Sequence, residues 1–301
     1  MINSIINPSI SFIIILVIIS SVLSACTEAS VSYQDDIVPN DLEASSPFET
    51  IIIDEYEIID VENNILNYHI EDLCLITPED NQLYQYTIEA PHLDPIIVAI
   101  DPGHQRRGNS EHEPIGPDAR ETKPKVSGGT KGVYTNVPEY ELTLAVSLLL
   151  RDELLSRGYE VVLIRENHDV DISNRERAGM ATEAGADIFV RLHADGSTNS
   201  NINGILLLCP RADNPFVAHL YEESRLLSEF ILEAMIAATG AKNRGIMEIN
   251  NMSGINWATM PVTIIEMGVM TNPTEDKLMQ TEEYQLKLVT GIADGIDAYF
   301  N

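Results

Sequence analysis

Two histidines and a glutamate, His104, His193 and Glu266, each stand at the end of a short apolar run that is typical of a buried strand. In open α/β sheets, reactive residues gather just beyond the carboxyl ends of the strands, so these side chains are expected to converge at one edge. Two imidazoles and a carboxylate are a natural set of zinc ligands, and a catalytic zinc also keeps a position for water. Spacing alone leaves either histidine equally compatible with a hydrogen-bonded structural role.

A zinc site of this kind needs a third ligand, and no paired-cysteine spacing exists that could supply it. Glu139 is the best-placed carboxylate, because it lies in the first turn of a helix predicted over 138–157, where the helix dipole favours a negative charge. Taken alone, such a residue is most often a solvated carboxylate on a helix face. His112 and Glu113 are an alternative source of ligands, in a long stretch after His104 that is predicted to be a surface loop bordering the cleft.

The elements that must position these residues alternate along the chain. Apolar periodicity and glycine stops predict strands at 96–101, 159–164, 187–192, 204–208 and 261–266, and helices at 138–157, 171–184, 216–239 and 282–300. Strands that alternate with helices indicate an α/β domain with a largely parallel central sheet and helices on both faces.

Several segments resemble the motifs of one family. Ala99-Ile-Asp-Pro-Gly-His-Gln105 resembles the start of the catalytic domain of the zinc-dependent N-acetylmuramoyl-L-alanine amidases of bacterial cell walls (amidase type 3). Later motifs of that family are similar to residues 139–147, 189–195 and 264–272, and its Arg-bearing segments to residues 162–166 and 175–177. The segments follow the order of the family over residues 96–301, which we therefore expect to be a zinc amidase catalytic domain.

The resemblance implies a peptidoglycan hydrolase that cleaves the amide between N-acetylmuramic acid and the L-alanine of the stem peptide by zinc-activated water. It implies that His104, Glu139 and His193 are zinc ligands and that Glu266 is the catalytic carboxylate. Zinc is the only cofactor expected, with no organic cofactor.

Substrate contacts are less well defined by the sequence. The candidates are Arg165, Asp195 and Asn272, and Asp195 stands where the family usually has Asn. Arg165, like Arg175 and Arg177, could meet carboxylates of the stem peptide. Pairing with the many acidic residues of the chain is the favoured interpretation for all three arginines.

Three other functions fit part of the sequence. A zinc peptidase that cuts within the stem peptide would use the same residues on a similar fold. A non-catalytic lipoprotein that binds wall fragments would have no need of Glu266. A solute-binding lipoprotein of a transporter predicts a larger, two-lobed chain without a metal set.

The N-terminus has the pattern of an export signal. An apolar run at 10–25 is short for a membrane span and ends in Leu23-Ser-Ala-Cys26, which resembles the lipobox of bacterial lipoproteins. Residues 1–25 are therefore predicted to be a lipoprotein-type signal peptide and Cys26 the lipidated residue. The alternatives are an uncleaved signal anchor, or cleavage near Ala25 with an idle cysteine, because no Lys or Arg precedes the run. Either way the chain is expected to be exported and to face the cell wall, and lipidation of Cys26 would anchor it in the membrane.

Residues 26–95 differ in composition from the rest, since the first basic residue of the chain is Arg106. We expect an acidic linker here, with strand-like patterns at 50–60 and 83–88 that could form a small β-unit or join the main sheet. The whole chain carries 47 acidic and 18 basic residues, a formal net charge of -29. A chain this acidic is repelled by nucleic acid, so peptidoglycan rather than DNA or RNA is the expected partner.

Overall fold

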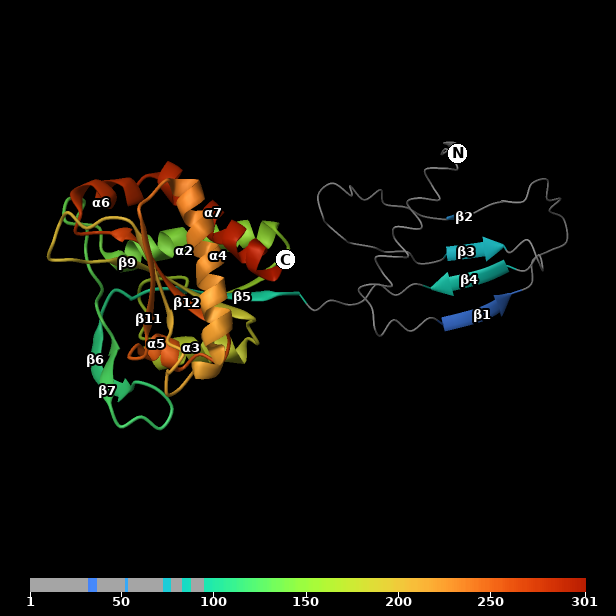
Figure 1. The fold of residues 1–301 in the computed structure, drawn as a ribbon, viewed down its shortest axis with the longest axis horizontal. Helices are drawn as coiled ribbons and strands as arrows, with labels where there is room; N and C mark the ends of the chain where they lie inside the picture. Colours follow the sequence, from blue (N-terminus) through green and yellow to red (C-terminus); the bar gives the residue numbers. More distant parts are fainter. Residues whose placement is uncertain (1–31, 37–51, 54–72, 77–82, 88–94) are drawn as a thin grey trace. The chain divides into compact units, whose positions relative to one another are not determined.

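The computed structural model describes residues 32–36, 52–53, 73–76, 83–87 and 95–301 (Figure 1). The chain divides into two units, Met1–Asp94 and Pro95–Asn301. The signal peptide predicted at 1–25 and the lipidation site predicted at Cys26 lie outside the described residues. Within the described part, no helix combines the length and the apolar character needed to cross a membrane.

The described strands of the first unit form a sheet of their own. They are β1 (Ser32–Asp36), β2 (Ile52–Ile53), β3 (Leu73–Ile76) and β4 (Leu83–Thr87), in the order β1-β4-β3-β2 with antiparallel pairing throughout. Strand β1 lies in a stretch that the sequence pattern indicated to be linker.

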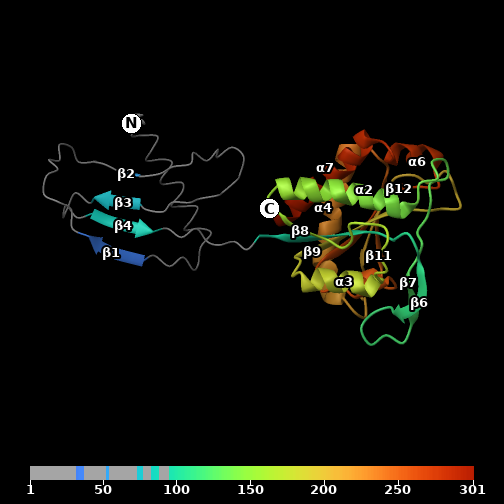
Figure 2. The ribbon, with the colours of Figure 1, turned by 180° about the vertical axis from the view of Figure 1, so that it is seen from behind.

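The second unit is built on a six-stranded sheet with helices on both faces (Figure 2). Its strands are β5 (Ile97–Pro102), β8 (Glu160–Leu163), β9 (Ile188–Asp195), β10 (Ile205–Pro210), β11 (Asn243–Ile249) and β12 (Val262–Val269). The order is β11-β10-β12-β9-β5-β8, and only the β10–β12 pair is antiparallel. The predicted α/β fold with a largely parallel sheet is therefore confirmed.

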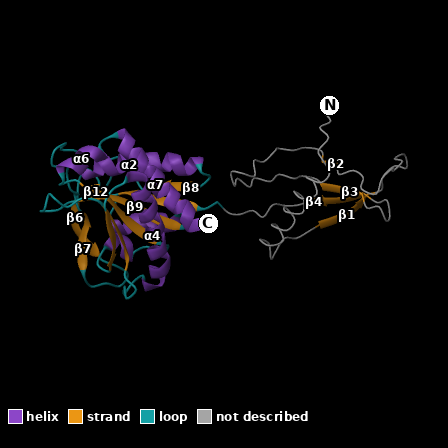
Figure 3. Ribbon diagram, turned by 45° about the horizontal axis from the view of Figure 1, so that its top comes forward, coloured by secondary structure: helices purple, strands orange, loops and turns teal. Residues whose placement is uncertain are grey.

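The alternation of side chains along the strands separates two apolar layers. Ile188, Val190 and Leu192 of β9 pack on the same side as helices α2 (Glu139–Ser156), α4 (Tyr221–Thr239) and α7 (Glu282–Phe300), which Figure 3 shows beside one another. Phe189, between them, faces the opposite layer with α3 (Asn174–Glu183), η2 (Ala218–Leu220) and α5 (Ser253–Asn256). Burial on both faces explains why the strands are nearly continuous apolar runs.

Five elements of the second unit were not expected from the sequence, and one helix begins later than predicted. The stretch predicted to be a loop after His104 contains a hairpin, β6 (Asn109–Pro114) and β7 (Thr122–Val126), and the other additions are β11, α5 and a short helix α6 (Pro273–Met279). Helix α3 begins at Asn174 rather than near 171, because Ser173 and Glu176 form a capping box.

Candidate metal centre

Three potential ligand atoms meet at the carboxyl edge of the sheet. His104 Nε2 lies 3.1 Å from Glu139 Oε1, His193 Nδ1 lies 3.2 Å from the same oxygen, and the two nitrogens are 3.1 Å apart. Within the described residues this is the only group of three or more His, Cys, Asp or Glu side chains that could hold a metal ion. The three residues come from the end of β5, the first turn of α2 and strand β9.

The triangle fits the donor set of a tetrahedral zinc. Ligand atoms about 2.0–2.1 Å from a tetrahedral ion are separated by roughly 3.3 Å, close to the separations in this cluster. His104 Nδ1 lies 3.0 Å from the carbonyl oxygen of Ser127, which can only accept, and 3.1 Å from the Ser127 hydroxyl. A hydrogen on Nδ1, donated to that carbonyl, leaves Nε2 with a free lone pair for a metal. Burial lowers the pKa of His193, which favours the neutral imidazole that a metal requires.

The turn that carries His104 has an unusual backbone. His104 adopts φ 61°, in the left-handed region that costs a non-glycine residue about 1–2 kcal/mol. The preceding residue must be glycine, because a Cβ at Gly103 would lie 2.4 Å from His193 Cε1 and 2.6 Å from the carbonyl oxygen of Leu192. This close approach brings β5 and β9 together at the point where both present an imidazole.

The Glu139 carboxylate is buried and held by backbone groups. Its Oε2 accepts a hydrogen bond from Thr130 N (2.7 Å), and its Oε1 accepts one from Ala194 N (3.0 Å). Burial by itself would raise the pKa of Glu139, but contact with the imidazoles of His104 and His193 more than offsets it, so this pKa lies below its usual range. The carboxylate is thus fixed in its charged form and in one orientation.

Glu266 lies beside this cluster. It is the Cα partner of His193 in the β9–β12 register, and both side chains line one open cleft of about 710 Å³. Burial and then the carboxylates of Glu139 and Asp195 raise the pKa of Glu266 well above its usual range, while Arg244 acts in the opposite direction. A bound cation would oppose this rise, because its positive charge favours the ionised carboxylate.

The candidates for substrate contact have different positions. Asp195 lines the cleft and accepts a hydrogen bond from Arg244 Nη2 at 2.8 Å. Asn272 instead caps α6, accepting from Thr274 N and Glu275 N. Arg165 is 2% exposed and donates to backbone carbonyls, so its guanidinium has no acidic partner among the described residues.

The alternative ligands lie in the hairpin and outside the cluster. His112 is exposed and contacts Thr122 Oγ1 at 3.0 Å across the two strands. Glu113 is buried and accepts a hydrogen bond from Arg175 N. The hairpin does border the cleft through Lys123, as the sequence suggested for this stretch.

Three residues around the cluster were missed in the sequence. Thr130 contributes only its backbone N–H, so its residue type carries no signal. Ser127 contributes its carbonyl oxygen and also its hydroxyl, which lies 3.1 Å from His104 Nδ1, but a single loop serine has no local pattern that indicates such a contact. Arg244 of β11 forms an ion pair with Asp195 of β9. The only indication of this pair in the sequence was that Asp195 stands where the family usually has Asn.

Asp101 anchors the strand that leads to His104. Its carboxylate is fully buried between two arginines, with Arg177 Nη1 at 2.6 Å and Arg191 Nε at 2.8 Å. Burial would raise the pKa of Asp101, but these two guanidinium groups outweigh it and hold the pKa well below its usual range. Arg177 therefore pairs with an acid of the chain, as expected from the sequence.

We expect Asp101→Asn to lower the free energy of unfolding by roughly 3–5 kcal/mol at neutral pH, because it leaves two buried guanidinium groups without a counter-charge. The native pKa of Asp101 lies below its unfolded value of about 3.8, so its contribution is complete above that pH and is lost as the pH falls toward the native pKa. Urea unfolding of both proteins from pH 7 to pH 3 measures this. A gap between the two proteins that stays constant down to pH 3 would contradict it.

Comparison with known proteins places this site in context. The mostly parallel sheet carries a His-Glu-His cluster at its carboxyl edge, in an open cleft. This combination is typical of a metal-dependent hydrolase of the α/β class. The chain belongs to the N-acetylmuramoyl-L-alanine amidase family, whose model matches residues 98–298. Members of this family are peptidoglycan hydrolases, so the family and the enzyme class expected from the motifs are confirmed.

Individual relatives agree with the family match. The N-acetylmuramoyl-L-alanine amidase Rv3717 of Mycobacterium tuberculosis is 28% identical over 218 residues, covering 68% of this chain and 86% of the relative. An uncharacterized cell wall amidase of Bacillus anthracis is 27% identical over 233 residues, but the match spans 74% of this chain and only 39% of that longer protein. The crystal structure of the amidase Ami1 from Mycobacterium abscessus aligns with a TM-score of 0.62 and 26% identity, covering 68% of this chain and 99% of that one.

Proposed function

We propose that residues 95–301 are a zinc-dependent amidase that hydrolyses the bond between N-acetylmuramic acid and the L-alanine of the stem peptide. The observation that carries this proposal is the triangle of ligand atoms from His104, Glu139 and His193, with sides of 3.1–3.2 Å, in the same cleft as Glu266. Three potential ligand atoms this close, around one point, match the arrangement that a shared cation would bind.

His104, Glu139 and His193 would hold the ion. Bound there, zinc would supply Lewis-acid chemistry, lowering the pKa of a water molecule and polarising an amide carbonyl. The two imidazoles and one carboxylate leave a coordination position free for this chemistry, as in catalytic rather than structural zinc sites.

Glu266 would move the protons. Its carboxylate would take a proton from the attacking water and deliver it to the amine of the departing stem peptide. Among the described residues, no hydrogen bond to another side chain ties down the Glu266 carboxylate, so both of its oxygens can serve substrate and water.

The cleft is open and can take a part of a polymeric substrate. Its volume of about 710 Å³ lies within the range of about 300–1,000 Å³ common for ligand sites. One wall is formed by the β6–β7 hairpin with Lys123 and Pro124, and another by Gly196 to Thr198 after β9. A glycan strand with its attached peptide could therefore lie across the zinc cluster.

Action on peptidoglycan also implies that the chain is exported. Lipidation at Cys26 would hold it at the outer face of the cytoplasmic membrane and within reach of the wall. The signal peptide, the lipid anchor and the linker role of residues 26–95 remain predictions from the sequence.

Product analysis tests which bond is cut. We expect the zinc-loaded protein to convert purified muropeptides into a disaccharide with a free lactyl carboxyl group and a peptide with a free L-alanine N-terminus, detected by mass spectrometry. Removal of zinc with a chelator should stop the reaction, and addition of zinc should restore it. Fragments cut inside the stem peptide would identify a peptidase instead. Unchanged muropeptides would contradict hydrolysis and favour a protein that only binds wall fragments.

A further inference from the structure

Arg165 is a buried cation with no acidic partner. Its side chain follows β8 and is 2% exposed, yet no carboxylate lies within ion-pair distance of it in the described part of the chain. Burial and the nearby guanidinium of Arg177 lower the pKa of Arg165 to about 10. The negative charge of Asp101 acts in the opposite direction, but Asp101 forms its ion pairs with Arg177 and Arg191. A buried charge without an ion-pair partner of its own is costly, so the contacts of Arg165 call for a specific explanation.

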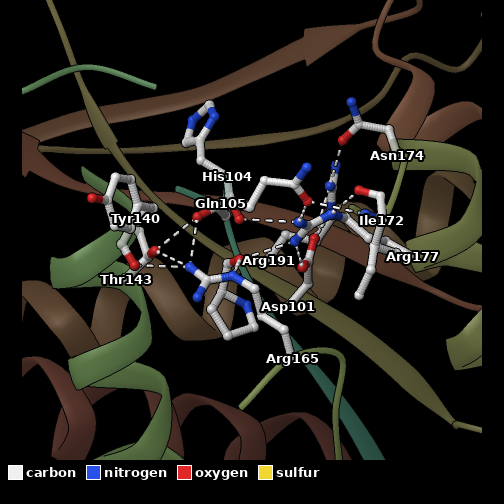
Figure 4. Close-up of polar contacts among 12 residues, drawn as sticks. Asp101, His104, Gln105, Tyr140, Thr143, Arg165, Ile172, Asn174, Arg177 and Arg191 are labelled. Carbon is white, nitrogen blue, oxygen red and sulfur yellow. Dashed lines mark hydrogen bonds and ion pairs between the residues drawn. The ribbon is translucent and has the colours of Figure 1, made fainter. Parts of the chain in front are cut away.

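The contacts of Arg165 join two segments that carry proposed zinc ligands. Nε donates to the carbonyl oxygen of Pro102 (2.9 Å) and Nη2 to that of Gly103 (3.1 Å), which directly precede His104. Nη2 also donates to the carbonyl oxygen of Tyr140 (2.8 Å), which directly follows Glu139. Figure 4 shows the guanidinium of Arg165 between these two segments.

Thr143 completes the connection. Its hydroxyl donates to the carbonyl oxygen of Gly103 at 2.8 Å and accepts from Arg165 Nη2 at 3.2 Å. Among the described residues, no backbone–backbone hydrogen bond joins the end of β5 to the first turn of α2. The side chains of Arg165 and Thr143 therefore provide the hydrogen bonds that connect the backbones of these two segments.

The turn at His104 needs such a constraint. Its left-handed backbone, with φ 61°, persists only if the surroundings determine it. Arg177 holds the other side of the turn, because its Nη2 donates to the carbonyl oxygen of His104 at 3.0 Å while Asp101 balances its charge. Arg165 differs from Arg177 in that it alone also contacts the helix that carries Glu139.

We propose that Arg165 is a positioning residue that holds His104 and Glu139 at the separation required to bind one metal ion. This inference rests on the proposed zinc site and adds a residue that neither touches the ion nor lines the cleft. Lysine cannot replace it, because one ammonium nitrogen cannot reach Pro102 and Tyr140 in the fixed planar arrangement of a guanidinium.

The test measures zinc affinity on metal-free protein, by competition with a chromogenic chelator, together with the melting temperature of the same metal-free sample. We expect Arg165→Lys to weaken zinc binding by about 10–100-fold, the usual effect of losing a group that orients metal ligands. Thr143→Val, which keeps the shape of the side chain and removes one link, should weaken binding by a smaller factor. Thr143→Ser, which restores the hydroxyl, should recover it.

Arg157→Lys is the matched control. Arg157 ends α2 at the helix terminus opposite Glu139 and pairs with Glu153, Asp294 and Asp297, so this exchange disturbs the same helix without touching the ligand segments. It should leave the zinc affinity unchanged whatever it does to the melting temperature.

The outcomes separate this inference from the proposed function. A wild-type protein that binds no zinc would overturn the zinc proposal itself, and this inference with it. Wild-type binding with unchanged affinity in Arg165→Lys would overturn only the positioning role, and a lower melting temperature alone would mark Arg165 as purely structural. If Arg165→Lys does not fold, the Thr143 pair of variants decides by the same criterion.

Discussion

Glu266→Gln should lower the rate of amide hydrolysis by about 10²–10⁴-fold while the protein keeps its zinc, because the exchange removes a proton acceptor but leaves the ligand triangle intact. The side chain has the same shape and remains in its place on β12 beside His193. The loss should be in kcat, since the amide can still line the cleft and contact substrate. Single-turnover rates on muropeptides, with zinc content determined on the same sample, measure both quantities.

The matched control for this prediction is Glu113→Gln. Glu113 is also a buried glutamate, but it lies in the hairpin and accepts a hydrogen bond from a backbone N–H, away from the cluster. Its exchange should leave the hydrolysis rate close to that of the wild type. Turnover by Glu266→Gln at the wild-type rate, with full zinc occupancy, would remove Glu266 from the mechanism.

The sequence predicted the core of the second unit because its elements have strong local signals. Strand β9 is mostly apolar before its polar end, with Arg191 as the exception, and is buried on both faces. Helix α2 is rich in leucine and helix α7 has a clear apolar stripe, so the predicted bounds of all three elements agree with the structure to within a few residues. The parallel arrangement of β5, β9 and β12 then explains why residues at their ends meet. Applied to the sequence alone, that geometric rule predicted that His104, His193 and Glu266 lie at the carboxyl edge of the sheet.

The elements that the sequence missed lack that periodicity. Strands β6 and β7 form a two-stranded ribbon that is largely exposed, so its residues are mostly polar and include prolines at 114 and 124. Strand β11 is an edge strand, exposed at Asn243 and interrupted by Gly245 with φ 86°. Neither pattern differs locally from that of a loop, and only pairing with distant residues makes them strands.

The partners of the three arginines could not be predicted from residue type. Arg165, Arg175 and Arg177 looked alike in the sequence, since each could pair with an acid. In the structure, Arg177 pairs with Asp101, Arg175 lies 4.4 Å from the centre of the Trp257 ring, and Arg165 binds only neutral oxygens. These outcomes depend on contacts more than 60 residues apart in the sequence, which no local pattern encodes.

The second large effect is expected at the histidines. His193→Ala and His104→Asn should each reduce zinc binding from about one ion per chain to a small fraction at micromolar zinc, and hydrolysis should fall with it, because two remaining ligands do not hold zinc tightly. Asn is chosen at position 104 because it tolerates the left-handed backbone there, so the loss can be attributed to the imidazole rather than to strain. Metal analysis after gel filtration, with circular dichroism to verify folding, measures the result.

His112→Asn supplies the comparison that makes this prediction decisive. His112 is exposed on the hairpin and is the one other histidine in the stretch between the proposed ligands of β5 and α2, so it is the natural competitor for a place in the site. Its exchange should leave both zinc content and hydrolysis unchanged. If His112→Asn lost the ion while His104→Asn kept it, the hairpin would have to fold over the cleft to supply a ligand, and the triangle formed by His104, Glu139 and His193 would not be the catalytic centre.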